Sequence, residues 1–256
     1  MRPWILLRGL MRETRHWGQF PQMLATHLPG AEIVPIDLPG NGSLYRQRSP
    51  DQVHDMSDAC RRQLQARGIA PPYNLLALSL GAMVACDWAT RHPGEVEKAV
   101  LINTSLRPFS PFYRRLRPRN YATLLRLAFG KDDDAWRERT ILRLTSNRHP
   151  PARLLSEWMR YLREQPVTRA NALRQLSAAM RYEAPRQPPA ADLLVLCGMG
   201  DRLVNAHCSM TLAQQWQAPL RAHENAGHDL TLDEPEWVAQ QIRDWISTGH
   251  AAGHGP

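Results

Sequence analysis

The stretch YNLLALSLGAMVACDWA, residues 73–89, is apolar almost throughout, yet it carries a single serine, Ser79. Residues 73–78 form a continuous apolar run with the length and composition of a buried strand. Residues 80–93 continue with the apolar character of a buried helix and end at a proline. The stretch therefore predicts a strand that turns directly into a helix, with one hydroxyl at the turn.

The residues on either side of this serine are small where a sharp turn requires small residues. A strand that turns abruptly into a helix holds its turn residue in strained backbone geometry, in which bulky neighbours collide. Ala77 and Gly81, two positions before and two positions after Ser79, relieve that crowding. The hydroxyl is then exposed at the carboxyl edge of the sheet, so the pattern indicates a nucleophilic serine.

The rest of the chain alternates short β-type runs with longer helical stretches, which is typical of a parallel sheet covered by helices. A length of 256 residues, 43% of them hydrophobic, is sufficient for one large α/β core. Ser49 and Asp51 are candidate capping residues at the start of one helix. The predicted strands are 3–8, 32–37, 73–78, 98–105, 192–198 and a weaker one at 219–225, and the predicted core helices are 49–68, 80–93 and 234–247.

Residues 106–186 differ from the rest of the chain, because they contain helix-like blocks broken at prolines and no buried strand pattern. We expect them to form an inserted helical cap, with the α/β core at 1–105 and 187–248 and a disordered tail at 249–256. The insertion holds 18 basic and seven acidic residues, a net charge of +11, whereas the remainder carries −3 of the total of +8. All of the net positive charge therefore belongs to the cap.

Two candidate partners for the serine follow later strands. A serine hydroxyl is a poor nucleophile unless a base takes its proton, and that base needs an orienting acid. Asp201 lies in the loop after the strand at 192–198, and His228 lies in the loop before the last helix. Catalytic groups collect at the carboxyl ends of strands in open α/β sheets, so the three loops can converge.

The motifs ILLRG, IDLPGNG, ALSLGA, RHPGEVEKAVLINTS, GMGDRLV and AGHDL, taken together, resemble those of the α/β-hydrolase superfamily. This resemblance implies an α/β-hydrolase fold with a mostly parallel sheet, lacking the family's first strands, and with residues 106–186 as the lid. It makes Ser79 the nucleophile, His228 the general base and then acid, and Asp201 its orienting acid. A subset of the family keeps the acid after the preceding strand, where this chain offers Asn103, which has no carboxylate.

The resemblance also implies an oxyanion hole made by the backbone N–H groups of Leu10 and Leu80. Two such donors stabilise the tetrahedral intermediate by about 3 kcal/mol each. The N–H of Leu80 also lies at a helix N-terminus, which favours negative charge. Where the family commonly has His-Gly before the first donor, this chain has Arg8-Gly9, which places a cation near the pocket.

Simpler explanations stay open for each of these residues. Ser79 can be a strand-end serine, Asp201 a carboxylate that caps its loop, and His228 a surface histidine. Arg8 can form an ion pair rather than contact substrate, and the arginines of the cap can form solvated outer faces of helices.

Composition and spacing exclude several other classes of protein. No apolar run reaches the ~18 to 20 residues of a membrane span, and the block at 111–121 is too short to indicate nucleic-acid binding by itself. No metal or organic cofactor is implied. The four cysteines lack paired or zinc-type spacing, which indicates reduced thiols in a cytoplasmic protein, with two of them in the core. They are Cys60, Cys86, Cys197 and Cys208, and the two core candidates are Cys86 and Cys197.

The expected function is hydrolysis of a carboxylic ester or thioester through an acyl-enzyme. A basic cap above such a site suits an anionic acyl substrate, either a small molecule or a carrier-linked group. Among family members, the carrier-protein methyl ester esterases resemble this layout of core and lid. Two alternatives are a lyase or other non-hydrolytic enzyme on the same fold, and a binding protein without catalytic activity.

Overall fold

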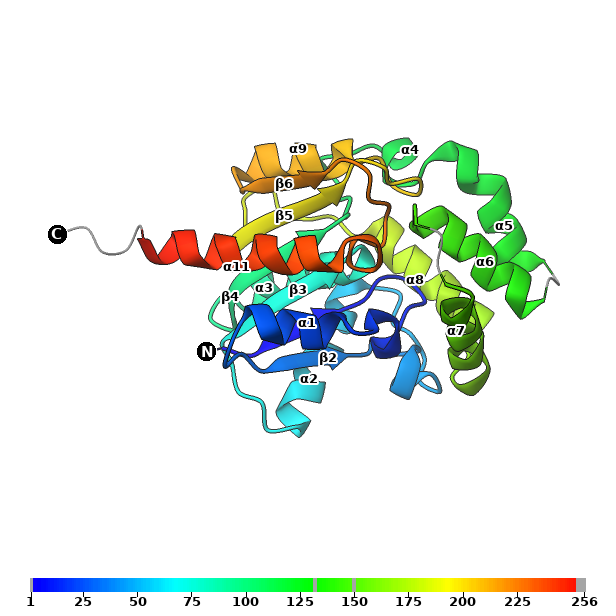
Figure 1. The fold of residues 1–256 in the computed structure, drawn as a ribbon, viewed down its shortest axis with the longest axis horizontal. Coiled ribbons are helices and arrows are strands. Elements are labelled where there is room, and N and C mark those ends of the chain that lie inside the picture. Colours follow the sequence, from blue (N-terminus) through cyan, green and yellow to red (C-terminus); the bar gives the residue numbers. More distant parts are fainter. Residues whose placement is uncertain (1, 131–132, 149–150, 252–256) are drawn as a thin grey trace.

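The computed structural model describes residues 2–130, 133–148 and 151–251, and a six-stranded sheet lies at its centre (Figure 1). The strand order is β2-β1-β3-β4-β5-β6, and every pair of neighbours is parallel, which confirms the predicted mostly parallel α/β sheet. The strands are β1 (Trp4–Leu7), β2 (Ile33–Ile36), β3 (Tyr73–Leu78), β4 (Val96–Ile102), β5 (Asp192–Gly198) and β6 (Leu220–His223).

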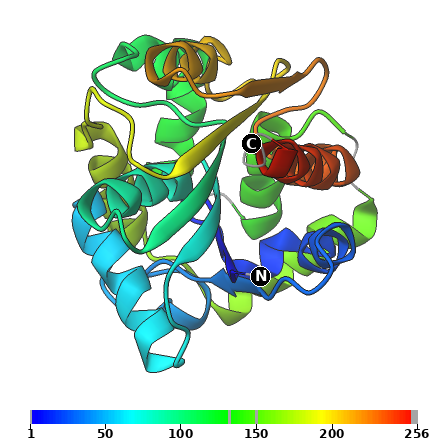
Figure 2. The same cartoon turned by 90° about the vertical axis from the view of Figure 1, so that its left-hand side faces the viewer.

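Two hydrophobic clusters lie on opposite faces of this sheet, because successive strand residues point to opposite sides. One cluster joins the sheet to α2 (Val53–Ala66), α3 (Leu80–Arg91) and α9 (His207–Trp216). The other joins it to α1 (Phe20–His27) and α11 (Pro235–Ala251), and Figure 2 shows these two helices across the sheet from α2 and α3. The strands are therefore covered on both faces, which explains their continuous apolar runs.

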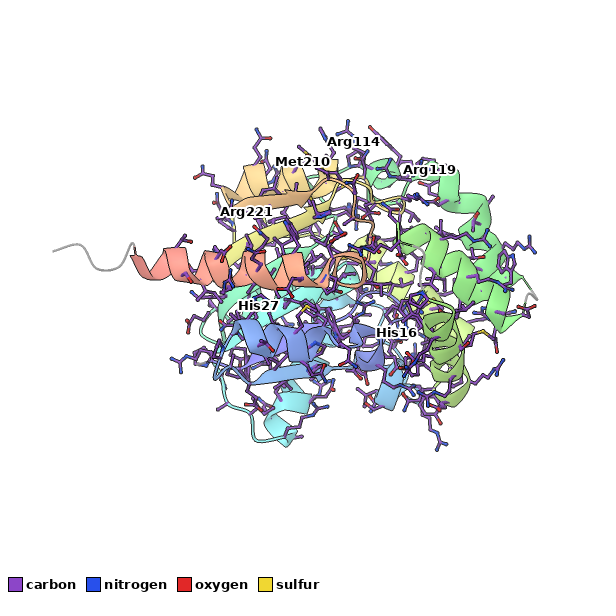
Figure 3. All side chains as sticks on the ribbon, viewed as in Figure 1. His16, His27, Arg114, Arg119, Met210 and Arg221 are labelled. Carbon is purple, nitrogen blue, oxygen red and sulfur yellow. The ribbon has the colours of Figure 1, made fainter. Side chains whose placement is uncertain are left out.

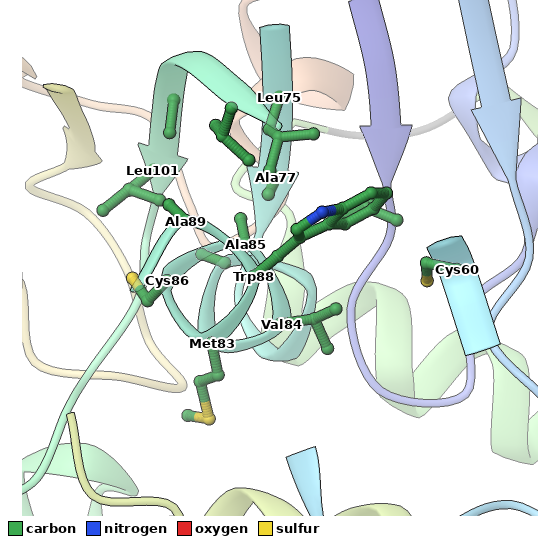
Figure 4. Close-up of a cluster of buried hydrophobic side chains, with 14 of the residues drawn as sticks. Cys60, Leu75, Ala77, Met83, Val84, Ala85, Cys86, Trp88, Ala89 and Leu101 are labelled. Carbon is green, nitrogen blue, oxygen red and sulfur yellow. The ribbon is translucent and has the colours of Figure 1, made fainter. Parts of the chain in front are cut away.

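Helix α3 is the most deeply buried helix of the core. Its residues from Leu80 to Ala89 are all buried, and small side chains bring it close to the sheet. Figure 4 shows Ala85 turned toward Ala77 of β3 and Ala89 beside Leu101 of β4. This close packing fixes the start of α3, and with it the residue at the turn from β3.

The chain between β4 and β5 forms the helical cap, which lies beyond the carboxyl ends of the strands (Figure 1). Its two ends are joined by a bridge between Arg107 and Glu183. The helices are α4 (Phe112–Arg115), α5 (Tyr121–Phe129), α6 (Asp134–Thr145), α7 (Ala152–Glu164) and α8 (Arg169–Arg181), with a short 3-10 turn, η3 (Pro118–Asn120), before α5.

Several features of the core differ from the sequence prediction. Helices α1 and α9, and the short helix α10 (Leu230–Asp233), lie in segments left unassigned. Helix α2 begins at Val53, because Ser49 donates its backbone N–H and its hydroxyl to Asn171 and Pro39 instead of capping the helix. Helix α11 continues to Ala251, so residues 249–251 of the predicted disordered tail are helical, and residues 252–256 lie outside the described part.

All four cysteines are free thiols and all are buried, which extends to Cys60 and Cys208 the core position expected for Cys86 and Cys197. Burial raises the pKa of Cys60 to about 12 and that of Cys197 to about 11, so these groups stay protonated at neutral pH. Across the described residues, no helix has the length and apolar character needed to cross a membrane.

Candidate active site

Ser79 lies at a strained turn between β3 and α3, as the small residues around it predict. Its backbone φ of 57° and ψ of −115° are rarely adopted by a residue with a side chain. A Cβ added at Gly81 would lie 2.5 Å from the carbonyl oxygen of Leu7 in β1, so a side chain there cannot be accommodated without a shift. The turn is also fastened to the sheet by a hydrogen bond of 2.9 Å from the Ser79 N–H to the Ile102 carbonyl.

Gly81→Ala is expected to lower the free energy of unfolding by about 1–3 kcal/mol, because the new methyl group overlaps the backbone of β1. Urea denaturation measures this change. Gly94→Ala is the matched control, since an added Cβ at Gly94 has no heavy atom within 4 Å. Equal stability of the two variants would contradict the close approach of α3 to β1.

Asp201 and His228 form a buried pair at the same edge of the sheet. The His228 Nδ1 and the Asp201 Oδ2 lie 2.7 Å apart. Because a carboxylate can only accept, Nδ1 donates and Nε2 is the acceptor in the neutral ring. The second oxygen, Asp201 Oδ1, accepts the backbone N–H groups of Leu203 and Val204 at 2.8 and 2.9 Å. The carboxylate is therefore held by its own loop and aimed at the imidazole.

Contacts on two sides connect the histidine loop to the end of β4 and the loop after β1 to Ser79. Asn103, which follows β4, donates to the carbonyl of His228 at 2.7 Å and accepts from the Gly198 N–H at 2.9 Å. On the other side, a Cβ added at Gly9 would lie 3.1 Å from the Ser79 Cβ, so the loop after β1 packs directly on the serine. Among the described residues the Ser79 hydroxyl has no hydrogen bond to His228, so the structure brings the three loops together and closes only the Asp201–His228 contact.

The backbone N–H groups of Leu10 and Leu80, the predicted oxyanion donors, belong to the two segments that meet at Ser79. Leu80 is the first residue of α3, where the N–H has no intrahelical acceptor. Leu10 follows Gly9, which packs on Ser79. Within the described part of the chain, neither N–H donates to another protein atom. Both donors are thus available to a negatively charged oxygen near the hydroxyl.

The charges around His228 favour its protonated form. Burial by itself lowers the pKa of the imidazole, but the charge and hydrogen bond of Asp201 and the charge of Asp229 outweigh it, so the pKa of His228 is raised above its ordinary value. A ring with this environment accepts a proton readily and stabilises the resulting cation. That is the behaviour of a general base.

The family model described as "Alpha/beta hydrolase family" matches residues 5–241. This range spans the sheet, the cap and the turn at Ser79 between β3 and α3, which we call the elbow. The chain belongs to the alpha/beta hydrolase family. The proteins to which this chain is similar carry names that describe different activities.

The chain is 27% identical over 270 residues to a 2-succinyl-6-hydroxy-2,4-cyclohexadiene-1-carboxylate synthase of Serratia proteamaculans, with 96% of this chain and 93% of that protein covered. It is 34% identical over 102 residues to the biotin biosynthesis bifunctional protein BioHC of Teredinibacter turnerae, with 40% of this chain and 17% of that protein covered. Among solved structures, an esterase from Exiguobacterium antarcticum superposes with a TM-score of 0.74 at 16% identity, over 96% of this chain and 92% of that one. The last likeness concerns the fold alone.

Arg8 is ion-paired, as one of the two sequence interpretations proposed. Its guanidinium donates to both carboxylate oxygens of Asp229, at 3.1 Å and 2.5 Å, and lies 4.8 Å from the ring centroid of Trp17. Both charged side chains are buried. This pair joins the residue before Gly9 to the residue after His228, so in this member of the alpha/beta hydrolase family Arg8 links the loop after β1 to the histidine loop.

Arg8→Met is expected to lower the free energy of unfolding by about 3–5 kcal/mol, because it leaves the Asp229 carboxylate buried without its cation. Urea denaturation of Arg8→Met, Asp229→Leu and the double variant measures the effect. Most of the loss should be recovered in the double variant, since replacing both charges leaves no buried charge unpaired. A loss in Arg8→Met as small as that of an exposed arginine would contradict this account.

The ion pair between Arg8 and Asp229 makes the free energy of unfolding depend on pH. Burial raises the pKa of Asp229, but the charge and hydrogen bonds of Arg8 outweigh it and hold the pKa below its ordinary value. The stabilisation is therefore complete above the unfolded-state pKa of about 3.9 and is lost as the pH falls through the lower folded-state value.

The cap is fastened to the loop that follows β1, which sequence analysis did not predict. Arg12 forms a buried ion pair of 2.9 Å with Glu138 of α6, and Gln175 of α8 accepts the Met11 N–H at 2.9 Å. His16 lies where this loop meets α7 and packs on Trp158 (Figure 3). Burial lowers the pKa of His16, and the cations of Arg12 and Arg8 lower it further, so the ring is neutral at pH 7.

Part of the positive charge of the cap serves its own structure. Arg115 donates to the carbonyls of Ala179 and Met180 at the end of α8, and Arg169 donates to that of Gly130 after α5. Arg114 and Arg119, by contrast, are exposed on the outer side of the cap (Figure 3). In the described residues no group of three His, Cys, Asp or Glu side chains is arranged to hold a metal ion.

Proposed function

We propose that this protein is a serine hydrolase that cleaves a carboxylic ester or thioester through an acyl-enzyme intermediate. The observation that carries the proposal is the buried hydrogen bond of 2.7 Å between Asp201 and His228, beside a serine in strained elbow geometry. A carboxylate that orients a histidine near a half-buried serine is an arrangement that supports acyl transfer. Membership of the alpha/beta hydrolase family supports the same reaction class.

In the first half of the reaction, Ser79 Oγ attacks the substrate carbonyl carbon while His228 Nε2 takes the hydroxyl proton. The carbonyl oxygen becomes negative and accepts hydrogen bonds from the N–H groups of Leu10 and Leu80. The imidazolium then gives its proton to the leaving alcohol or thiol as the bond to the acyl carbon breaks. An acyl-serine ester remains.

In the second half, water attacks the acyl-serine, and His228 takes a proton from that water. Collapse of the second tetrahedral intermediate releases the acid and returns the proton to Ser79 Oγ. Asp201 stays ionised throughout and stabilises the imidazolium that forms twice in the cycle.

The charge of the cap favours an anionic acyl substrate. The segment at 106–186 carries a net charge of +11, and its arginines include exposed side chains on the outer surface. Such a field raises the local concentration of a negatively charged substrate and speeds its association at low salt. We therefore propose that the substrate is a negatively charged ester or a carrier-linked acyl group. We expect kcat/KM to fall as the ionic strength rises.

A non-hydrolytic reaction is the second candidate, favoured by the synthase from Serratia proteamaculans that matches 96% of this chain. The name of that protein describes a product with a succinyl group and a ring carboxylate, an anionic molecule that the charge of the cap also suits. In such a reaction, His228 and the serine would move a proton of the substrate itself, and no water would be consumed.

Hydrolysis of p-nitrophenyl esters over a range of acyl lengths tests the first candidate directly. We expect turnover that stops after treatment with a serine-reactive phosphonate, together with a mass increase on the peptide that contains Ser79. In water labelled with ¹⁸O, the acid product of a hydrolase carries the label. Turnover without label would favour the non-hydrolytic candidate, and a folded protein that neither turns over nor reacts with phosphonate would favour a binding protein.

A further inference from the structure

The turn that follows α6 leaves the cap and makes contact with the two loops that hold Asp201 and His228. This turn, residues 145–147, is separated from the acid loop by more than 50 residues of sequence and from the histidine loop by about 80. None of its residues belongs to the triad, the oxyanion hole or the sheet. Three of its hydrogen bonds nevertheless reach those two loops, and two more reach Asp233 of α10.

Asn147 joins the two loops through its side-chain amide. Its Nδ2 donates to the carbonyl of Gly200 at 2.9 Å and to that of Asn225 at 2.8 Å. Gly200 is the neighbour of Asp201 in the chain, and Asn225 lies three residues before His228. One NH₂ group therefore uses both of its hydrogens to fix the acid loop against the histidine loop.

Asp233, the last residue of α10, holds the same turn through its carboxylate. Its Oδ2 accepts the N–H groups of Gly227 at 2.6 Å and Asn147 at 3.0 Å, and its Oδ1 accepts the hydroxyl of Ser146 at 2.5 Å. The side chain is buried, with 1% of its residue surface exposed. A buried carboxylate that accepts three hydrogen bonds is strongly oriented, so it holds the residue before His228 and the turn in one fixed arrangement.

The approach of the turn is close enough to require glycine on both loops. A Cβ added at Gly200 would lie 2.3 Å from the Asn147 Nδ2, and one added at Gly227 would lie 2.8 Å from the Thr145 carbonyl oxygen. That same carbonyl accepts the N–H of Asp229 at 2.7 Å. The turn thus contacts the backbone immediately before Asp201 and on both sides of His228.

We propose that Asn147 and Asp233 are positioning residues, which together hold the His228 loop against the Asp201 loop and so make the cap part of the structure that orients the histidine. We name the turn at 145–147 with Asp233 the cap clamp. The inference rests on the proposed function in one respect, because the catalytic consequence requires His228 to be the base. The structural consequence, the distance between Asp201 and His228, does not depend on the reaction.

The cap clamp explains how a cap helix affects the base without touching it. The 2.7 Å contact between Asp201 and His228 joins two loops that leave different strands, β5 and β6. If Asn147 no longer ties Gly200 to Asn225, the contacts of Asn103 with Gly198 and His228 remain, but the separation of the two loops is less closely fixed. A displacement of about 1 Å at a catalytic group reduces turnover on the order of 10²-fold.

Asn147→Ala is the first variant to test, because it removes only the amide that bridges the two loops. Asp201, Asp229 and Arg8 are the charged groups that act on His228, and Asp201 is the one whose loop Asn147 fastens. We expect nuclear magnetic resonance titration to show a lower pKa for His228 than in the wild type, because the carboxylate lies farther away. We also expect kcat on a p-nitrophenyl ester to fall at least tenfold with little change in KM.

Arg148→Gln is the matched control. Arg148 directly follows the turn, but its ion pair with Glu234 is solvent-exposed and touches neither catalytic loop, so titration and kcat should stay as in the wild type. Asp233→Ala should act like Asn147→Ala. Asp233→Asn should recover most of the effect, because its amide oxygen still accepts N–H groups and its NH₂ can donate to Ser146.

A wild-type titration of His228 in folded Asn147→Ala, with unchanged kcat, would overturn the cap clamp. The same holds if Arg148→Gln shifts the titration as much as Asn147→Ala does, since the effect would then be general to the turn. Failure of the proposed function is a separate result: if Ser79→Ala keeps its esterase activity, the titration still decides the clamp. Circular dichroism and the melting temperature establish that each variant is folded.

Discussion

Ser79→Ala is expected to reduce ester turnover by about 10⁴-fold or more, since the nucleophile of a serine hydrolase accounts for most of its rate enhancement. Alanine removes one oxygen atom and leaves the Cβ that packs beside Gly9. The turn at residue 79 keeps a side chain of similar bulk, so the fold should be preserved. Initial rates with p-nitrophenyl esters and the melting temperature measure the two expectations together.

The size of the residual rate in Ser79→Ala decides whether Ser79 is the nucleophile. The oxyanion donors Leu10 and Leu80 remain in place, so a small rate above that of water is compatible with the proposal. Turnover within tenfold of the wild type would reject Ser79 as the nucleophile. A serine-to-alanine change at Ser105, which is buried at the base of the cap and lies outside the proposed machinery, is the matched control and should leave kcat near the wild-type value.

Asp201→Asn is expected to lower kcat by about 10⁴-fold at neutral pH, because an amide in this position selects the wrong tautomer of His228. The amide oxygen is expected to keep accepting from Leu203 and Val204, which turns the NH₂ group toward the imidazole. His228 Nδ1 would then have to accept that hydrogen, and its proton would move to Nε2. A ring with a proton on Nε2 cannot take another from Ser79.

The same change should lower the pKa of His228, because Asp201 is the main group that raises it. The acidic limb of the kcat/KM profile reports the pKa of the free base, so it should move to lower pH while the plateau falls. Asp192→Asn, at the opposite end of β5 in an exposed ion pair, is the control. A profile of Asp201→Asn that matches the wild type would assign the role of orienting acid to another residue.

Among the contacts between the cap and the core, three lie beside parts of the proposed machinery. Gln175 of α8 accepts the N–H of Met11, next to the oxyanion donor Leu10. Glu138 of α6 pairs with Arg12 on the same loop. Asn147, after α6, contacts the acid and histidine loops. The cap is therefore joined by short connections to the loops that carry Leu10, Asp201 and His228.

The sequence by itself determined the sheet, the elbow and the identity of the proposed triad. Strands buried on both faces are continuously apolar, so β3 and β5 could be predicted to their exact ends in Tyr73–Leu78 and Asp192–Gly198. The requirement of an elbow for small neighbours is local, which is why Ala77 and Gly81 identify Ser79. The order of the proposed nucleophile, acid and base along the chain then follows from the parallel topology.

Only the tertiary structure decided which side chains hold these groups in place. Arg8 and Asp229 are more than 200 residues apart, and no local pattern distinguishes an arginine that will be buried in an ion pair from one that will be solvated. Asn147 and Asp233 likewise look like an ordinary turn residue and a helix-end carboxylate. Their roles arise from contacts between distant segments, and such contacts depend on the packing of the whole chain rather than on periodicity or spacing.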